Sequence, residues 1–276
     1  MKNAIVTGSS SGFGKLIAIE LARSGFNVIA TMRDLQKADS LLEIAKAEKL
    51  TEFIDVYPLD VTSAASINGF KAYIEDINSV DLLVNNAGFA KGGFCEELSL
   101  DEYRVQFETN FFGAVAVAQA IIPAMRQQGS GKIINMSSIS GRFGFPGLSA
   151  YVSSKHALEG FSESLRLELR PFGIDVILVE PGSYNTNIWS SIENVQLGQQ
   201  SPYNSSMAAI LKEVKKGETQ YGHPQEVAML VTKIASASEK SRLRYPIGKG
   251  VNRTILLKNL LPWKVIEKFL TKKLYK

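Results

Sequence analysis

The chain contains a single cysteine, Cys95, and two histidines, His156 and His223, among its 276 residues. One cysteine excludes an intrachain disulfide and a cysteine-cluster metal site, and two histidines leave little for a zinc site. No uncharged apolar run reaches about 18 residues, the length that a transmembrane helix needs. Residues 1–8 arrive at a glycine too soon for a signal peptide. We therefore expect no bound metal, no transmembrane helix and a reducing, cytoplasmic setting.

Charge is distributed unevenly along the chain. Residues 240–276 carry eleven Lys and Arg side chains against one acid, Glu267, so that segment has a net charge of +10. The whole chain has a net charge of +4, which leaves −6 for residues 1–239. The basic character belongs to the C-terminal extension. It does not indicate a nucleic-acid-binding surface over the whole domain, and no nucleic-acid partner is expected.

Short apolar runs alternate with longer amphipathic stretches. Runs typical of β-strands lie at residues 4–7, 27–31, 53–59, 82–85, 132–136 and 175–180, and helical patterns lie at 14–24, 35–49, 64–77, 100–127 and 150–170. This alternation predicts an α/β fold, a single domain over residues 1–276 with a doubly wound parallel sheet and helices on both faces. Residues 183–222 lack regular patterning and are interpreted as a substrate lid. Residues 250–276 are a basic amphipathic C-terminal extension, with a helix expected at 256–274.

The first predicted strand runs directly into a glycine-rich loop, which a helix follows. Its glycines are Gly8, Gly12 and Gly14, in a G-x-x-x-G-x-G spacing rather than the more common G-x-G-x-x-G. Glycines in such a loop let backbone N–H groups approach a pyrophosphate at a helix N-terminus. Taken alone, the pattern is equally compatible with an ordinary glycine-rich turn.

Further motifs occur in a consistent order along the first 190 residues. They are Asp60-Val61, Asn85-Asn86-Ala87-Gly88, Asn110, Ser138, Tyr151-x-x-x-Lys155 and Pro181-Gly182-x-x-x-Thr186. Together with the glycine spacing, they resemble the classical short-chain dehydrogenase/reductase family. Residues 30–34 and the segment after residue 250 are similar to its NADP-type steroid and retinol dehydrogenase branch. The resemblance implies a Rossmann-type fold and hydride transfer between a nicotinamide cofactor and an alcohol or carbonyl group.

The spacing of Tyr151 and Lys155 supports a catalytic pair on physical grounds. Four residues apart on a helix, the phenol and the ammonium share one face. A tyrosine pKa near 10 has to fall by about three units to act at neutral pH, which corresponds to about 4 kcal/mol. One cation about 4 Å away supplies about that much at an effective dielectric near 20. An isolated pair of this kind is more often a solvated surface pair, and the surrounding motifs favour the catalytic interpretation.

The resemblance assigns the catalytic roles. Tyr151 would be the general acid, and Lys155 would lower the tyrosine pKa and bind the nicotinamide ribose. Ser138 would bond the substrate oxygen, and Asn110 would hold a water for proton resupply. Cofactor binding is assigned in the same way to Gly8, Ser10, Ser11, Gly12, Phe13, Gly14, Arg33, Asp60, Val61, Asn86, Ala87, Gly88, Tyr151, Lys155, Pro181, Gly182 and Thr186.

The end of the second predicted strand bears on the choice of cofactor. Met32 stands where NAD-type members of the family keep an acid for the ribose hydroxyls, and Arg33 follows where NADP-type members keep a basic residue. Asp34 comes one residue late and is free to pair with a neighbouring base. A second basic marker is absent, because Ser11 precedes the middle glycine. Arg33 therefore favours NADP(H) over NAD(H).

Apolar side chains are expected around the mouth of the site. The candidates are Phe89, Phe94, Phe143, Phe145, Leu148, Tyr184, Ile188, Trp189, Ile192, Val195, Leu197, Tyr203, Met207 and Ile210. An apolar lid suits an apolar substrate, although the same side chains also serve to close a lid onto the core. We expect an enzyme that acts on a steroid-, retinoid- or lipid-like or aromatic carbonyl or alcohol.

Two other functions are open from the sequence alone. One is a nucleotide-sensing binding protein that keeps the fold, and the presence of Ser138, Tyr151 and Lys155 argues against it. The other is a membrane-surface adaptor that uses the basic extension. A basic amphipathic helix more often docks on its own domain, so membrane contact through residues 258–274 is a hypothesis only. The family's usual homodimer is expected, paired through helices 100–127 and 150–170.

Overall fold

The sheet is built from parallel strands on both sides of the first one. The computed structural model describes residues 1–77, 79–186, 195, 197–219 and 221–274. Its strands are β1 (Lys2–Thr7), β2 (Phe26–Met32), β3 (Ile54–Pro58), β4 (Leu82–Asn85), β5 (Gly131–Met136), β6 (Ile174–Pro181) and β7 (Arg244–Ile247). Over the described residues, these seven form one sheet in the order β3-β2-β1-β4-β5-β6-β7. The order reverses between β1 and β4, which confirms the doubly wound Rossmann topology.

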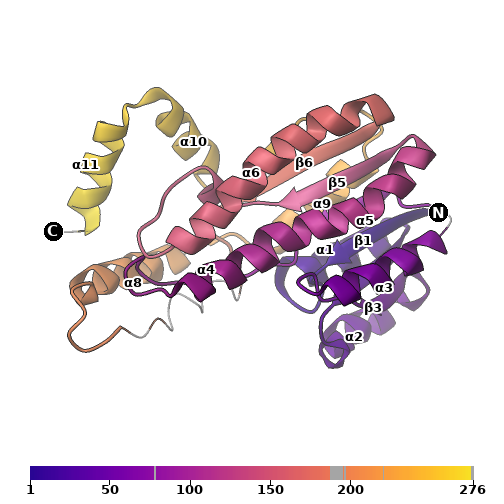
Figure 1. Ribbon diagram of the computed structural model, residues 1–276, viewed down its shortest axis with the longest axis horizontal. Helices are drawn as coiled ribbons and strands as arrows, with labels where there is room; N and C mark the ends of the chain where they lie inside the picture. The colour runs from indigo at the N-terminus through magenta and orange to yellow at the C-terminus, as the bar shows by residue number, and fades with distance from the viewer. Residues whose placement is uncertain (78, 187–194, 196, 220, 275–276) are drawn as a thin grey trace.

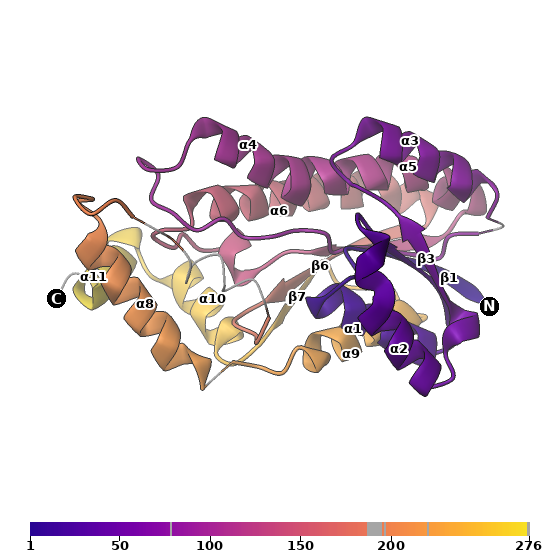
Figure 2. The same cartoon turned by 90° about the horizontal axis from the view of Figure 1, so that it is seen from below.

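Helices cover both faces of the sheet (Figure 1, Figure 2). One face carries α1 (Gly12–Arg23), α2 (Asp39–Ala47) and α9 (Gln225–Ser236). The other carries α3 (Ala64–Glu75), α5 (Gly113–Gln128) and α6 (Ser149–Leu169). A shorter helix, α4 (Leu100–Phe107), leads into α5 through a π-helical turn, η3 (Glu108–Phe112). Short 3₁₀ segments are η1 (Leu35–Ala38), η2 (Thr51–Phe53), η4 (Ile139–Gly141) and η5 (Arg170–Phe172).

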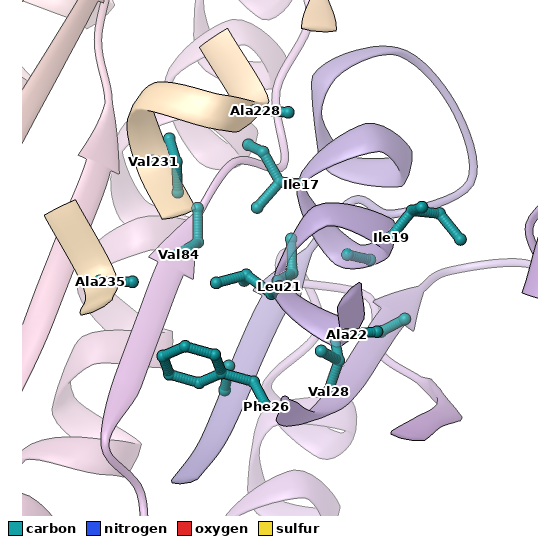
Figure 3. Close-up of a cluster of buried hydrophobic side chains, with 14 of the residues drawn as sticks. Ile17, Ile19, Leu21, Ala22, Phe26, Val28, Val84, Ala228, Val231 and Ala235 are labelled. Atoms are coloured by element: carbon teal, nitrogen blue, oxygen red, sulfur yellow. The ribbon is translucent and has the colours of Figure 1, made fainter. Parts of the chain in front are cut away.

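Alternate residues of the central strands face the two helical layers. In β1, Ala4 and Val6 belong to the core under α1 and α9, whereas Ile5 belongs to the core under α3 and α5. Figure 3 shows the first core, where Ile17 and Leu21 of α1 meet Val231 of α9. Both faces of the sheet are apolar, as expected for parallel strands covered on two sides.

The continuous helical stretch 100–128 is the one described helix with the length and mean hydropathy (1.2) that a membrane span requires. Those two properties are weak evidence for a span, because the core helix of a globular domain shares them. Val117, Ile121 and Met125 in this stretch have no exposed surface and pack on the sheet. The apolar side chains of this helical stretch therefore cover the sheet.

Three parts of the fold differ from the sequence expectation. The edge strand β7 was not predicted, and it contains Pro246, which an edge strand tolerates. The segment 183–222 is not irregular throughout, because it contains α8 (Asn204–Glu218). The expected helix 256–274 is two helices, α10 (Val251–Leu260) and α11 (Trp263–Leu274), divided at Pro262. Proline cannot continue a helix without losing a backbone hydrogen bond, which explains the division.

Candidate active site

The loops that follow β1 and β4 are hydrogen-bonded to each other at the carboxyl end of the sheet. The Asn86 side-chain amide donates to the carbonyl oxygens of Thr7 (2.8 Å) and Gly8 (3.1 Å). In return, the Thr7 hydroxyl accepts the backbone N–H groups of Asn86 and Ala87, each at 2.9 Å. These bonds fix both walls of the crevice at the point where the strand order reverses, the usual ligand site of such sheets.

The glycine loop leaves the N-terminus of α1 open. Gly8 and Gly12 adopt positive φ angles of 68° and 56°, which glycine allows at low cost. A Cβ at Gly14 would lie 2.3 Å from the Gly8 carbonyl oxygen, so only glycine fits this close approach. Ser11 at the N-cap makes no side-chain capping bond, and the first turn contains no acid. The first N–H groups of α1 are therefore available to an anion, and this cradle fits a dinucleotide pyrophosphate.

The end of β2 presents positive charge. Met32 is buried, whereas Arg33 is exposed. The Asp34 carboxylate caps η1 by accepting the Gln36 N–H at 3.0 Å and lies 3.9 Å from the Lys37 ammonium. It is thus engaged locally, whereas Arg33 is the exposed charged side chain directly after β2.

Lys15 is a second cation on the same side of the crevice, and the sequence reasoning missed it. It follows the third loop glycine, and its ammonium contacts the Ser40 hydroxyl in α2, at 3.4 Å. The signal available in the sequence was its place in the first turn of the helix that binds the pyrophosphate.

Asp60 and Val61 follow β3 on the same edge of the sheet. The Asp60 carboxylate accepts the N–H and the hydroxyl of Thr62, at 3.0 and 2.7 Å. Burial opposes ionisation of Asp60, but these bonds and the charge of Arg33 outweigh it and lower its pKa. Val61 packs against Gly113, where a Cβ would lie 2.7 Å from the valine side chain.

One face of α6 is joined to the end of β5 by three successive contacts. The Lys155 ammonium donates to the Met136 carbonyl at 2.7 Å. One turn along, Glu159 accepts the Ser137 hydroxyl at 2.5 Å. One turn back, the Tyr151 hydroxyl interacts with Ser138. Three residues at four-residue spacing thus meet three consecutive residues at and directly after the end of β5, and this pairing fixes the positions of Tyr151, Lys155 and Ser138 relative to one another.

Burial controls the protonation of the pair. It raises the pKa of Tyr151 to about 12, against the opposing effect of its contact with Ser138. Burial also lowers the pKa of Lys155 to about 8, and the negative charge of Glu159 limits that fall. Desolvation therefore outweighs the lowering of the Tyr151 pKa that was expected from Lys155, and the role of Lys155 toward Tyr151 stays a prediction. The ammonium lies 5.7 Å from the centre of the Tyr151 ring and is bonded to a carbonyl, so desolvation of the phenolate dominates. Tyr151 keeps its proton at neutral pH.

Asn110 lies in the π-helical turn η3, where both groups of its side-chain amide are engaged. Its oxygen accepts the Phe89 N–H at 3.1 Å, and its nitrogen donates to the Phe89 carbonyl at 2.9 Å and to the Ser154 hydroxyl at 3.3 Å. A π-turn re-aims side chains and is frequent at functional sites. Asn110 thus ties the loop after β4 to α6 beside Lys155, whereas its predicted role in holding a water stays a prediction.

Below the catalytic residues lies a charged network that the sequence reasoning missed. Arg244 of β7 contacts Glu159 (2.9 Å) and the fully buried Glu180 (3.2 Å). Arg142 contacts the same oxygen of Glu180 at 3.2 Å. Burial raises the pKa of Glu180, with a further contribution from the charge of Glu159. Its sequence signal was an acid directly before the Pro181-Gly182 motif and directly after the apolar run 176–179.

The loop after β6 only partly matches its predicted role. The Gly182 N–H donates to the Ile247 carbonyl at 2.8 Å, which holds this loop on β7. Thr186 is half-buried. Tyr184, predicted to line the substrate pocket, is instead buried in the core, edge-on to Phe13 with ring centres 5.7 Å apart. The Tyr184 ring packs beneath the glycine loop, so its predicted place in the lining of the substrate pocket is corrected.

Several of the predicted apolar lid residues lie near the catalytic residues. Phe94 stacks on Tyr203, with ring centres 4.3 Å apart, and joins the loop after β4 to the segment before α8. Phe143 and Phe145, in the loop after η4, have ring centres 6.3 Å apart. The half-buried members are Leu148, Val195, Leu197 and Ile210. Met207 is buried, and Phe89 is 36% exposed. Ile188, Trp189 and Ile192 lie outside the described residues.

Comparison with known proteins agrees with this geometry. Residues 2–215 match the family model of the short chain dehydrogenases. The chain belongs to this family. It is 51% identical over 277 residues to the uncharacterized oxidoreductase YusZ of Bacillus subtilis, with 99% of each chain covered. It is 38% identical to a 3-ketodihydrosphingosine reductase of Bacteroides thetaiotaomicron, over 84% of this chain and 82% of that protein.

A retinol dehydrogenase is also among the relatives of this short-chain dehydrogenase. The chain is 42% identical to human retinol dehydrogenase 8, over 66% of this chain and 58% of that protein. A solved short-chain dehydrogenase from Streptomyces avermitilis is 33% identical, with a TM-score of 0.81 over 99% of this chain and 97% of that one. Two solved chains of the same fold, each 24% identical, are complexes with 5-hydroxy-NADP and with NAD. The fold therefore binds a nicotinamide cofactor without fixing which one.

Proposed function

We propose that this short-chain dehydrogenase uses NADP(H) to reduce a carbonyl group of an apolar molecule, or to oxidise the corresponding alcohol, with Tyr151 as the general acid and base. The observation that carries the proposal is the buried, protonated Tyr151 hydroxyl against Ser138, at the carboxyl end of β5. A phenol that keeps its proton at neutral pH is in the acid form that carbonyl reduction needs.

Ser138, Tyr151 and Lys155 have separate roles in the reaction at the substrate oxygen. The Ser138 oxygen accepts the Ser140 N–H at 3.1 Å, and its hydroxyl interacts with Tyr151, so its hydrogen turns to the substrate oxygen only when a substrate is bound. Tyr151 transfers its proton to the same oxygen. The charge of Lys155 then stabilises the phenolate that Tyr151 leaves behind. When bound in the crevice, the nicotinamide supplies the hydride for reduction and accepts it in the reverse direction.

The preference for NADP(H) is supported by the charges at the end of β2. Arg33 is exposed there, and Lys15 in α1 is a second cation of this part of the chain. Asp34, the acid that follows Arg33, is engaged with Gln36 and Lys37, and Asp60 is close enough to Arg33 for that charge to lower its pKa. A ribose 2′-phosphate is recognised by cations, whereas a 2′-hydroxyl is recognised by a free carboxylate.

An apolar substrate is supported by the aromatic side chains of the loops beside Tyr151, and by two relatives, one named for 3-ketodihydrosphingosine and one for retinol.

A homodimer through residues 100–128 and α6 is supported by exposed apolar residues in these helical stretches. Val105, Phe112 and Leu167 are 56%, 50% and 72% exposed in the single chain. We expect light scattering to give twice the chain mass for the wild type, and the chain mass for Phe112→Glu.

A substrate panel tests the proposal. NADPH and NADH consumption would be followed with steroid, retinoid, long-chain keto and small aromatic carbonyls, for wild type, Tyr151→Phe and Tyr57→Phe. Tyr57, on β3, is a matched control, because its hydroxyl donates to the Gly69 carbonyl of α3 at 3.3 Å. The proposal expects NADPH-preferring turnover that Tyr151→Phe abolishes and Tyr57→Phe keeps. Tight NADPH binding without turnover of any panel member would instead indicate a nucleotide sensor.

A further inference from the structure

Helix α10 turns most of its apolar residues away from the domain. Its inner side carries the buried Val251 and the half-buried Lys258. Leu256, Leu257 and Leu260, on the opposite side, are 57%, 44% and 70% exposed. A helix that only covers its own domain places its leucines inward. The three leucines of α10 thus face away from the domain.

The exposed surface continues past Pro262 into α11. Leu261, Trp263, Val265 and Phe269 are exposed by 39%, 56%, 49% and 69%. These four residues and the three leucines of α10 lie within residues 256–269 and are here called the C-terminal apolar patch. Exposed apolar side chains that gather in one segment mark contact sites.

The charges around the patch indicate its partner. Arg253, Lys264, Lys268 and Lys272 are exposed beside it, and Glu267 is the one acid of the whole segment 240–276. A second copy of this chain would bring the same positive charges against them, which is unfavourable. A lipid surface with anionic headgroups offers both an apolar interior for the patch and opposite charge for its rim.

The inner side of α10 anchors the patch to the active-site loops. The Lys258 ammonium donates to the Arg142 carbonyl and lies 5.0 Å from the centre of the Phe143 ring, in the loop that follows Ser138. Val251 packs on Gly182, where a Cβ would lie 2.5 Å from the valine side chain. Helix α11 packs against α8, the helix within the proposed lid (Figure 2). The patch therefore lies on the same end of the molecule as the mouth of the site.

We propose that α10 and α11 dock this enzyme on an anionic lipid bilayer, with the C-terminal apolar patch inserted at the boundary between headgroups and acyl chains. Docking in this position places the substrate entrance beside the bilayer, so an apolar substrate reaches the site without crossing water. The docking itself stands apart from the proposed catalysis, since it rests on α10 and α11 alone.

The intrinsic tryptophan fluorescence of the full chain tests the docking. The sequence has two tryptophans, Trp189 and Trp263, so a Trp189→Phe chain reports on the patch alone. Its emission would be recorded with vesicles of phosphatidylcholine containing about 30% phosphatidylglycerol, and with pure phosphatidylcholine. Sedimentation with the same vesicles gives the bound fraction. We expect a blue shift and at least tenfold stronger binding to the anionic vesicles.

Two variants distinguish vesicle binding through the patch from nonspecific vesicle binding. Leu260→Glu places a charge in the patch, and Met229→Glu makes the same kind of change on the outer side of α9, where Met229 is 58% exposed. We expect Leu260→Glu to weaken vesicle binding at least tenfold, since burying one leucine contributes about that factor, and Met229→Glu to leave it unchanged. Equal binding of both variants would overturn the proposal. A wild type that does not bind vesicles would also overturn the proposal. If its dimer dissociates on Leu260→Glu, a second copy of the chain covers the patch instead.

Discussion

Glu159 is the residue outside the catalytic set whose replacement should change the chemistry most. It is buried, four residues after Lys155 on the same face of α6, and it accepts the Ser137 hydroxyl directly before Ser138. Glu159→Gln keeps the size of the side chain and an oxygen for Ser137. The substitution removes the one negative charge that opposes the loss of the Lys155 proton.

The magnitude follows from Coulomb's law. Charges about 7 Å apart, as expected for long side chains one turn apart on a helix, interact by about 2.4 kcal/mol at an effective dielectric of 20. That corresponds to between one and two pH units. The pKa of Lys155 lies at about 8 with Glu159 present. Without that charge it should fall to about 6 to 7, and Lys155 would be largely neutral at pH 7.5.

The assay is the pH profile of kcat/KM for NADPH-dependent reduction, which reports the ionisation of the free enzyme. Reduction needs charged Lys155, so activity is present below the lysine pKa and lost as pH rises through it. The wild-type profile should decline near pH 8, and the Glu159→Gln profile one to two units lower. At pH 5.5 to 6 the two activities should converge.

Glu163→Gln is the matched control. Glu163 lies one turn further along α6 and pairs with the same Arg244, at 2.5 Å, but its side chain is 55% exposed. Its replacement should leave the decline near pH 8. If Glu159→Gln folds normally by circular dichroism and its decline stays with that of the wild type, Glu159 does not set the charge of Lys155 and the reasoning is refuted.

Three further predictions concern the cofactor crevice and its supports. Arg33→Ala should lower kcat/KM for NADPH about tenfold and leave NADH use unchanged, because a 2′-phosphate loses a cation; equal losses with both cofactors would contradict the NADP assignment. Gly14→Val should abolish NADPH binding in a fluorescence titration and destabilise the fold by about 1–3 kcal/mol in urea, since its side chain collides with the Gly8 carbonyl. Asn110→Ala should cost about 1–3 kcal/mol of unfolding free energy, because it removes the acceptor of the Phe89 N–H, whereas the Phe89 carbonyl keeps the Gln106 amide as a donor; a loss well below about 1 kcal/mol in urea would show that this bond is replaceable.

The sequence predicted six of the seven described strands, including β3 at one edge of the sheet, and missed β7 at the other edge. Buried parallel strands are continuous apolar runs, so β4, at Leu82–Asn85, was predicted with its observed bounds. The edge strand β7 has four half-buried residues, among them Arg244 and Pro246, and carries no such signal. It forms because β6 offers a free edge for pairing, which is a property of the assembled sheet.

The shared helix face of Tyr151 and Lys155 was predictable from their spacing, whereas their electrostatics were not. A four-residue spacing places Tyr151 and Lys155 on one face of a helix, but it does not show how deeply they are buried. Burial reverses the expected pKa shift of Tyr151. The contacts of Glu180 with Arg142 and Arg244 also join segments far apart in the chain, so no local pattern could reveal them.

The most direct test of the account is a single turnover of the enzyme–NADPH complex with its best carbonyl substrate, for wild type and Tyr151→Phe. General acid catalysis contributes about 10²- to 10⁴-fold to such a step. The account predicts that the rate of NADPH oxidation falls by at least 10²-fold in the variant, while the NADPH dissociation constant changes less than about threefold. A single-turnover rate that survives the loss of the hydroxyl would contradict the account and assign the proton to another group.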